Sequence, residues 1–142
     1  MIQVGERASE VRQHFSEFID GVVRDRPGFV IRNRDAIAAL NLEHIEVLLS
    51  TIEFHVQFHK DENGDIIGTL EEVDDLVVCE SSKDEALQSL ANDLIEYAEE
   101  YLTTSFKLYF NAPNRRNHFP YVLKVATQPT AEHVTRLLHA RP

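Results

Sequence analysis

Strict alternation of apolar and polar residues, followed by a turn, constrains the fold of this chain more than any other feature. In "IEFHVQFH", residues 52–59, every second side chain is apolar, which is the pattern of a strand with one buried face. Asn63-Gly64 follows, and this pair is the strongest short signal for a hairpin turn. Two more strand-like runs, 66–71 and 76–80, come next. The pattern predicts three consecutive strands joined by turns.

One long helix is expected after the third strand. Ser82 and Glu85 have the spacing of a capping box, in which the two residues satisfy free backbone N–H groups of the first turn. An apolar stripe with helical spacing follows, and the helix could run on to about Phe110, with Pro113 ending it. The stripe consists of Leu87, Leu90, Ala91, Leu94, Ile95, Ala98, Tyr101 and Leu102.

The first fifty residues show a different order of elements. From Ser9 the apolar residues form one stripe of an amphipathic helix, which Pro27-Gly28 ends. Asn and Asp in "RNRD" tolerate turn geometry, so the apolar runs on either side predict a hairpin. The expected elements around this helix are a short strand at 2–4, the hairpin of 29–31 with 36–40, and a second helix over 42–49.

Together these patterns predict an α+β fold of two domains. Residues 1–50 are expected to form β-α-β-β-α, and residues 51–142 to form β-β-β-α with a short helical C-terminal tail. In the tail, 112–142, "FPYVLKVATQ" and "PTAEHVTRLL" each carry a proline placed to begin a helix. A strand at Tyr121–Val125 is the alternative.

Charge is unevenly distributed along the chain. The net charge of -10 divides into +1 for residues 1–34, -15 for residues 35–111 and +4 for residues 112–142. A uniformly acidic protein is a poor nucleic-acid binder, because affinity depends largely on neutralising phosphates. Here the two ends could meet anions, or an acidic partner, while the middle repels them.

Four arginines in the first domain are candidates for DNA contact. We expect Arg12 in the first turn of the first helix, where free N–H groups and the helix dipole favour a phosphate. Arg7 precedes that helix, and Arg32 and Arg34 flank the hairpin tip. Arginine suits both phosphate binding and bidentate reading of guanine. Ordinary salt bridges to nearby acids such as Glu10, Glu17 or Asp35 are the alternative.

Signals for catalysis are missing from the sequence. It has no glycine-rich nucleotide loop, no P-loop, no nucleophile elbow and no His-Glu-x-x-His, so we expect neither enzymatic activity nor a cofactor. His55 and His59 lie on the polar face of their strand, where solvated surface is the favoured interpretation. Asp61, Asn63, Asp65 and Glu72 match four positions of a calcium loop, but Ile66 replaces its required glycine, which favours a plain hairpin turn.

Two further features bear on the environment of the protein. The single cysteine, Cys79, follows two valines and is expected to be a packed strand residue rather than a reactive thiol. No apolar run approaches the length that spans a bilayer, and the N-terminus lacks a signal pattern. We therefore expect a cytoplasmic protein without a membrane partner.

Residues 1–50 resemble the Phd/YefM antitoxin domain. The resemblance rests on "SEVRQHFSEFIDGVV", on the arginine-containing hairpin "FVIRNRDAIAAL" and on the helix "NLEHIEVLL". It implies a symmetric homodimer that binds operator DNA through arginines at the first helix and the hairpin. Carried over, these roles fall on Arg12 first, then on Arg7, Arg32 and Arg34.

Residues 51–102 look like the HicB-like antitoxin domain, with an acidic Asn-Gly turn, two more strands and a long helix that begins at "SSKDEAL". The two resemblances imply a type II antitoxin that represses its own operon and neutralises a basic, RNA-cleaving toxin. The acidic run from Glu71 to Asp75, together with Glu99 and Glu100, suits a basic partner, although a solvated face is the simpler interpretation. Expected partner contacts are Glu71, Glu72, Asp74, Asp75, Arg115 and Arg116. The alternative is an interaction module that acts through residues 51–142 without binding DNA.

Overall fold

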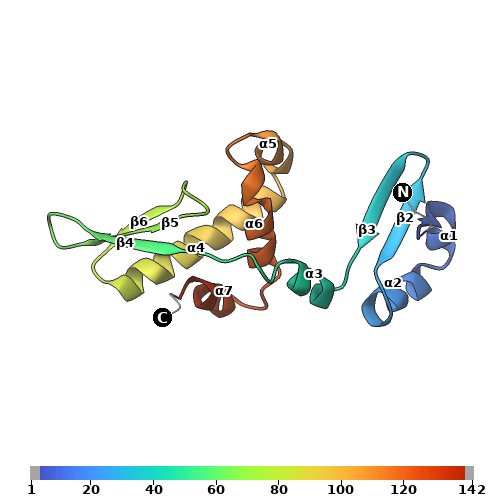
Figure 1. The fold of residues 1–142 in the computed structure, drawn as a ribbon, viewed down its shortest axis with the longest axis horizontal. Helices are drawn as coiled ribbons and strands as arrows, with labels where there is room; N and C mark the ends of the chain where they lie inside the picture. The colour runs from blue at the N-terminus through green and yellow to red at the C-terminus, as the bar shows by residue number, and fades with distance from the viewer. Residues whose placement is uncertain (1–3, 140–142) are drawn as a thin grey trace. The chain divides into compact units, whose positions relative to one another are not determined.

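The computed structural model describes residues 4–139 of the chain (Figure 1). It forms two compact units, Met1–Leu48 and Leu49–Pro142. Each unit has its own three-stranded sheet and its own helices, which confirms the predicted mixed α+β class.

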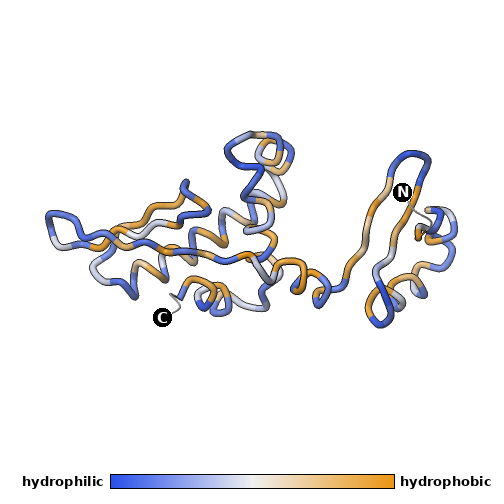
Figure 2. The backbone as a smooth tube through the Cα atoms, in the orientation of Figure 1, coloured by the Kyte–Doolittle hydropathy of each residue, from blue (hydrophilic) through white to orange (hydrophobic). Residues whose placement is uncertain are grey.

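Unit 1 is built on the sheet β1-β2-β3. β1, Glu6–Arg7, pairs in parallel with β2, Gly28–Arg32, and β2 pairs antiparallel with β3, Asp35–Ala39. The β2–β3 hairpin matches its prediction to within one or two residues. The strand expected at 2–4 falls largely outside the described residues, and the described strand lies two residues further along the chain. Figure 2 shows the two strands of the hairpin as mainly apolar and its tip as polar.

The first helix of unit 1 is divided, contrary to the prediction of one helix. α1, Ala8–Gln13, and α2, Phe15–Arg24, are separated by His14, whose φ of -126° and ψ of 43° lie outside the helical region. The apolar spacing continues through this break, so the hydrophobic pattern gave no sign of it. Val11 of α1 and Val22 of α2 are the buried apolar side chains among residues 4–48.

Asn41 joins the last helix of unit 1, α3 (Leu42–Leu48), to the end of α2. Its side-chain oxygen accepts from the backbone N–H of His44 at 2.9 Å, which satisfies a free donor of the first turn. Its amide nitrogen donates to the carbonyls of Val22 and Val23 at 3.1 and 3.2 Å. One side chain thus begins α3 and fixes its start against α2.

Unit 2 contains the antiparallel sheet β4-β5-β6, one face of which α4 covers (Figure 1). The helix approaches β5 closely at Gly68, where an added Cβ would lie 3.1 Å from Leu90. The predicted N-cap is confirmed, since Ser82 Oγ accepts from the N–H of Glu85 at 3.2 Å. The elements are β4, Val56–Lys60, β5, Ile66–Leu70, β6, Val77–Glu80, and α4, Lys83–Leu102.

The C-terminal tail belongs to the core of unit 2. Its buried side chains, Val122, Val125, Val134 and Leu138, pack in the same cluster as α4. α4 ends at Leu102 instead of running on to 110, and the possible strand at 121–125 is helical. The elements of the tail region are α5, Phe106–Asn111, the 3-10 helix η1, Arg116–His118, α6, Phe119–Ala126, and α7, Ala131–Leu138.

Lys124 fastens the segment by which the chain enters unit 2. Its Nζ donates to the carbonyl of Leu49 at 3.1 Å and also to that of Ile52. The start of unit 2 is therefore held by α6, which lies more than seventy residues further along the chain. Within the described residues, no helix is both long enough and apolar enough to cross a membrane.

Candidate functional site

Three of the four arginines singled out in the sequence line one pocket of unit 1. Parallel pairing of β1 with β2 places Arg7 opposite Ile31, and so brings the start of α1 beside the end of β2. The resulting cavity, of about 700 Å³, is called the cationic pocket below. It is lined by Arg7, Ala8, Ser9, Arg12, Ile31, Arg32 and Asn33, with no acidic residue among them.

Arg12 occupies a different place in its helix from the one expected. The break at His14 shortens α1 to six residues, so Arg12 lies in its last turn. Arg12 therefore lies away from the positive end of the helix dipole. What suits Arg12 to an anion is instead that it lines the cationic pocket together with Arg7 and Arg32.

The hairpin arginines are separated by the geometry of the turn. Arg32 pairs with Asp35 across the hairpin, which leaves Asn33 and Arg34 at the tip. Arg32 lines the cationic pocket, whereas Arg34 does not. Arg32 also donates to Asp35 at 3.5 Å, but both side chains are about three-quarters exposed, so this pair contributes little. Among the described residues, Arg7, Arg12 and Arg34 form no salt bridge.

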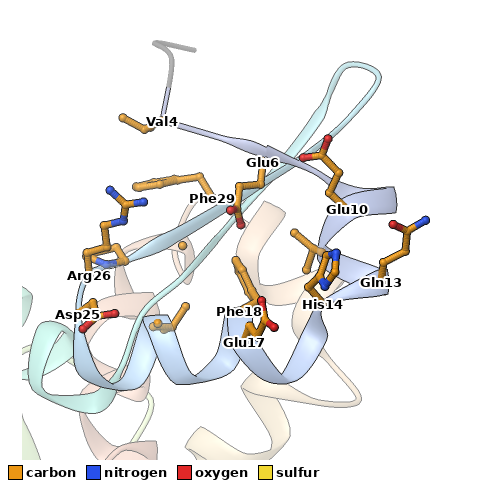
Figure 3. A pocket seen from close by; sticks show the side chains of 15 residues that line it. Val4, Glu6, Glu10, Gln13, His14, Glu17, Phe18, Asp25, Arg26 and Phe29 are labelled. Carbon is orange, nitrogen blue, oxygen red and sulfur yellow. The ribbon is translucent and has the colours of Figure 1, made fainter.

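A second pocket of unit 1, of about 610 Å³, has the opposite charge (Figure 3). Its lining includes Glu6, Glu10, Glu17 and Asp25 around apolar side chains such as Phe18. Arg26 and His14 are the basic residues of this lining. An anion would therefore be repelled here and attracted to the cationic pocket.

Unit 1 also exposes a stripe of large apolar side chains. Phe15, Ile19 and Val23 of α2 are 58, 42 and 55% exposed, and their spacing places them along one side of the helix. Ile37, Leu42, Val47 and Leu48 of the same unit are exposed as well. Contiguous apolar surface of this kind marks an interaction surface.

The acidic residues predicted to bind a partner lie in the loop between β5 and β6, and two of them are held within the chain. Glu72 accepts from the backbone N–H of His55 at 2.6 Å and lies 2.8 Å from its Nδ1, which raises the pKa of His55. Asp75 forms a salt bridge of 3.2 Å with Arg115. Glu71 and Asp74 are exposed, and Asp74 Oδ1 lies 3.9 Å from Nε2 of His118.

The two predicted basic contacts, Arg115 and Arg116, stack on aromatic rings of α5. The Arg115 guanidinium lies 4.1 Å from the ring centre of Tyr109, and that of Arg116 lies 4.4 Å from Phe110. Arg115 therefore connects α5 to the acidic loop through Asp75. Arg116 remains exposed.

His118, close to these arginines in the chain, is a buried residue that the sequence did not predict to be part of the site. His118 is 4% exposed, and its Nδ1 lies 2.6 Å from the hydroxyl of Tyr97. Burial lowers the pKa of His118, although Asp75 and Asp74 act in the opposite direction. Its position in a basic, Asn-rich loop gave no periodic signal that would have predicted burial.

The residues of the calcium-loop alternative are divided between two places. Asp61 accepts from the N–H groups of Asn63 and Asp65, both at 2.9 Å, which forms the predicted hairpin turn. Possible ligand atoms lie within 4.8 Å of one another in two groups, one of His55, Glu71 and Glu72 and one of Asp61, Asp65 and Cys79.

The expectation that Cys79 is packed is wrong. It lies on β6 as predicted, but its side chain is exposed. The neighbouring Val78 takes the buried position instead, because successive side chains of a strand point to opposite faces.

Comparisons with known proteins indicate an antitoxin of a toxin-antitoxin system. The PHD-like family model, described as antitoxin of toxin-antitoxin, RelE / RelB, TA system, matches residues 1–140. No curated protein matches the chain. A crystal structure of the antitoxin part of a proposed toxin/antitoxin system from Syntrophomonas wolfei subsp. wolfei is 43% identical, with a TM-score of 0.85. The match covers 95% of this chain and 96% of that one.

Proposed function

The chain belongs to the PHD-like family of antitoxins of toxin-antitoxin systems, and we propose that it binds operator DNA as a homodimer, represses its own operon and neutralises a basic, RNA-cleaving toxin. Family membership points to a regulatory role rather than an enzymatic one. The proposal places the protein in the cytoplasm, as the sequence predicts.

The observation that carries the DNA proposal is the cationic pocket. Arg7, Arg12 and Arg32 come from β1, α1 and β2 and line one cavity that has no acidic residue. Three arginines that line one pocket suit the phosphates of a duplex, because each guanidinium can donate two parallel hydrogen bonds to phosphate oxygens. Arg34, at the hairpin tip, is the fourth proposed contact.

The test is a mobility-shift titration of the full-length protein with DNA from upstream of its gene. Replacing Arg12 with Ala should weaken binding at low salt and reduce the slope of log affinity against log salt by about one. Arg24→Ala is the matched control, because Arg24 is exposed, pairs with Asp20 and lies outside the cationic pocket. Equal effects of the two substitutions would contradict the proposed site.

The apolar stripe of α2 supports the homodimer. A second copy of unit 1 would cover Phe15, Ile19 and Val23 and so remove exposed apolar surface from water on both copies. A two-fold dimer also presents two cationic pockets, which suits an operator with two related half-sites.

Charge supports the toxin proposal. Residues 49–100 contain Lys60 and Lys83 against fifteen acidic residues, a distribution that attracts and orients a basic partner. The exposed Glu71 and Asp74 are the proposed direct contacts, whereas the pairs of Glu72 with His55 and of Asp75 with Arg115 hold the loop in place. Arg116, exposed beside the loop, is a further proposed contact.

The toxin proposal is tested with the product of the neighbouring gene. Glu71→Lys combined with Asp74→Lys should weaken binding in calorimetry, while Glu96→Lys combined with Glu99→Lys makes the same charge change on the exposed side of α4. Equal weakening by both pairs would indicate general attraction without a site at the loop. Partner binding by a protein that binds no DNA would favour the alternative of an interaction module.

A further inference from the structure

Asn33 occupies the tip of the β2–β3 hairpin and lines the cationic pocket beside Arg32. It is the one non-glycine residue with positive φ, 56°, in the described part of the chain. Asparagine tolerates this left-handed conformation better than most residues, which accounts for its backbone. The conformation alone does not account for an amide group in an arginine-lined pocket, since glycine would serve the turn equally well.

The amide of Asn33 is free of hydrogen bonds to other described residues, and the side chain is exposed. The hairpin of unit 2 behaves differently, because its turn residue Asp61 accepts from two backbone N–H groups. Turn residues of this type commonly make such local bonds. Asn33 therefore keeps one acceptor and two donors available for a ligand.

A carboxamide offers what is needed to recognise a base. Asparagine can donate to N7 and accept from N6 of adenine in a bidentate contact, and a two-stranded ribbon fits the major groove. Arg7, Arg12 and Arg32 line the same pocket as Asn33 and carry charges that suit phosphates, and phosphate contacts fix the register in which a base is read.

From this arrangement we infer that Asn33 reads an adenine edge in the operator, while the arginines of the cationic pocket bind the DNA backbone. The inference rests on the proposed DNA binding and adds a specificity-determining residue to it. In a homodimer, the Asn33 of each copy would read one base pair in the half-site that this copy binds.

The experiment compares full-length wild type, Asn33→Gly and Arg12→Ala on two duplexes of equal length. One duplex is the upstream DNA of the gene, and the other has a scrambled sequence. Asn33→Gly keeps the left-handed turn and removes the amide. It should lose roughly 5- to 150-fold in affinity for the upstream duplex, the range for one bidentate base contact, with the scrambled duplex and the salt slope unchanged. Arg12→Ala should weaken binding to both duplexes and reduce the slope.

A second measurement identifies the base that is read. Each base pair of the bound site is substituted in turn, and the affinities of wild type and Asn33→Gly are compared. The affinity of wild type should fall when one particular A·T pair in each half-site is substituted. The affinity of the variant should not change with the base pair at this position. Undiminished discrimination by a normally folded Asn33→Gly, as judged by circular dichroism, overturns this inference and leaves the proposed function intact. Equal binding of wild type to both duplexes, or to neither, overturns the proposed operator binding itself.

Discussion

The two units differ in what they bury. Unit 2 gathers fifteen buried residues in one cluster, whereas residues 4–48 of unit 1 bury Val11 and Val22. Among residues 4–139, eight of the ten exposed large apolar side chains belong to unit 1, and Val77 and Leu108 belong to unit 2. Small units bury too little surface to be stable alone unless they associate. Unit 2 therefore has a core of its own, whereas unit 1 leaves much of its apolar surface in contact with water, as expected if it forms the proposed homodimer.

The largest effect is expected in the core of unit 2. Leu94 of α4 is fully buried, so Leu94→Ala should lower the free energy of unfolding of unit 2 by about 3–5 kcal/mol, through lost burial and the cavity left behind. Urea unfolding followed by circular dichroism measures the change. Leu108→Ala is the control, because Leu108 is 71% exposed in the same unit and should change stability by less than about 0.5 kcal/mol. Similar losses in both variants would show that unit 2 is not packed as described.

The next largest effect is expected in unit 1, on the stability of the proposed homodimer. Ile19→Glu places a charge in the middle of the α2 stripe and should lower the stability of the proposed dimer by about 1.5–3 kcal/mol, the value of burying one large apolar side chain. The melting temperature of unit 1 should also lose its dependence on protein concentration. Analytical ultracentrifugation over a hundredfold concentration range is the measurement. Gln13→Glu is the control, because it adds the same charge on α1 outside the stripe. A wild-type protein that is monomeric at every concentration would contradict the proposed dimer.

A pH effect on stability is expected in unit 2. Folded His118 has a lowered pKa, so below about pH 6.5 the unfolded chain takes up a proton that the folded one resists. Stability should therefore fall with decreasing pH, by at most about 1.4 kcal/mol per pH unit for this one group. His118→Gln should flatten the fall in urea unfolding measured from pH 7.5 to 5.5. His55 has a raised pKa and acts in the opposite direction, but it is present in both proteins. Parallel curves would contradict the assignment to His118.

The smallest effect concerns the beginning of α4. Ser82→Ala removes the acceptor of the Glu85 N–H and should lower the stability of unit 2 by about 1 kcal/mol, with no change in unit 1. Ser82→Asn, which can accept the same bond, should restore most of the loss. Thermal unfolding followed separately for the two units distinguishes these outcomes. An Asn variant as unstable as the Ala variant would mean that the cap contributes nothing.

Local patterns predicted the elements that depend on local chemistry. The alternation before Asn63-Gly64, the hairpin around "RNRD" and the cap at Ser82 all recur in the structure within a few residues. The break at His14 and the end of α4 at Leu102 did not follow from the pattern, because the apolar spacing continues through both. The divided helix is also why Arg12 was expected in a first turn and lies in a last one.

Contacts between residues that lie far apart in the chain could not be predicted from the sequence. No local pattern shows that parallel pairing of β1 with β2 brings Arg7, Arg12 and Arg32 to one pocket, or that Arg34 does not line it. The attachment of the acidic loop to Arg115, forty residues later, is of the same kind. Asn33 was read as a turn residue, and only its place in the cationic pocket suggests a further role.

The bond between Lys124 and the segment that enters unit 2 has a consequence for synthesis of the chain. Lys124 is added 72 residues after Ile52, whose carbonyl it binds. At ordinary translation rates the ribosome needs about 4–14 s for this stretch. All of unit 1 exists during that interval, with its apolar stripe exposed and the junction not yet fastened. The homodimer that we propose for unit 1 would therefore form between copies growing on neighbouring ribosomes before either copy has a folded unit 2.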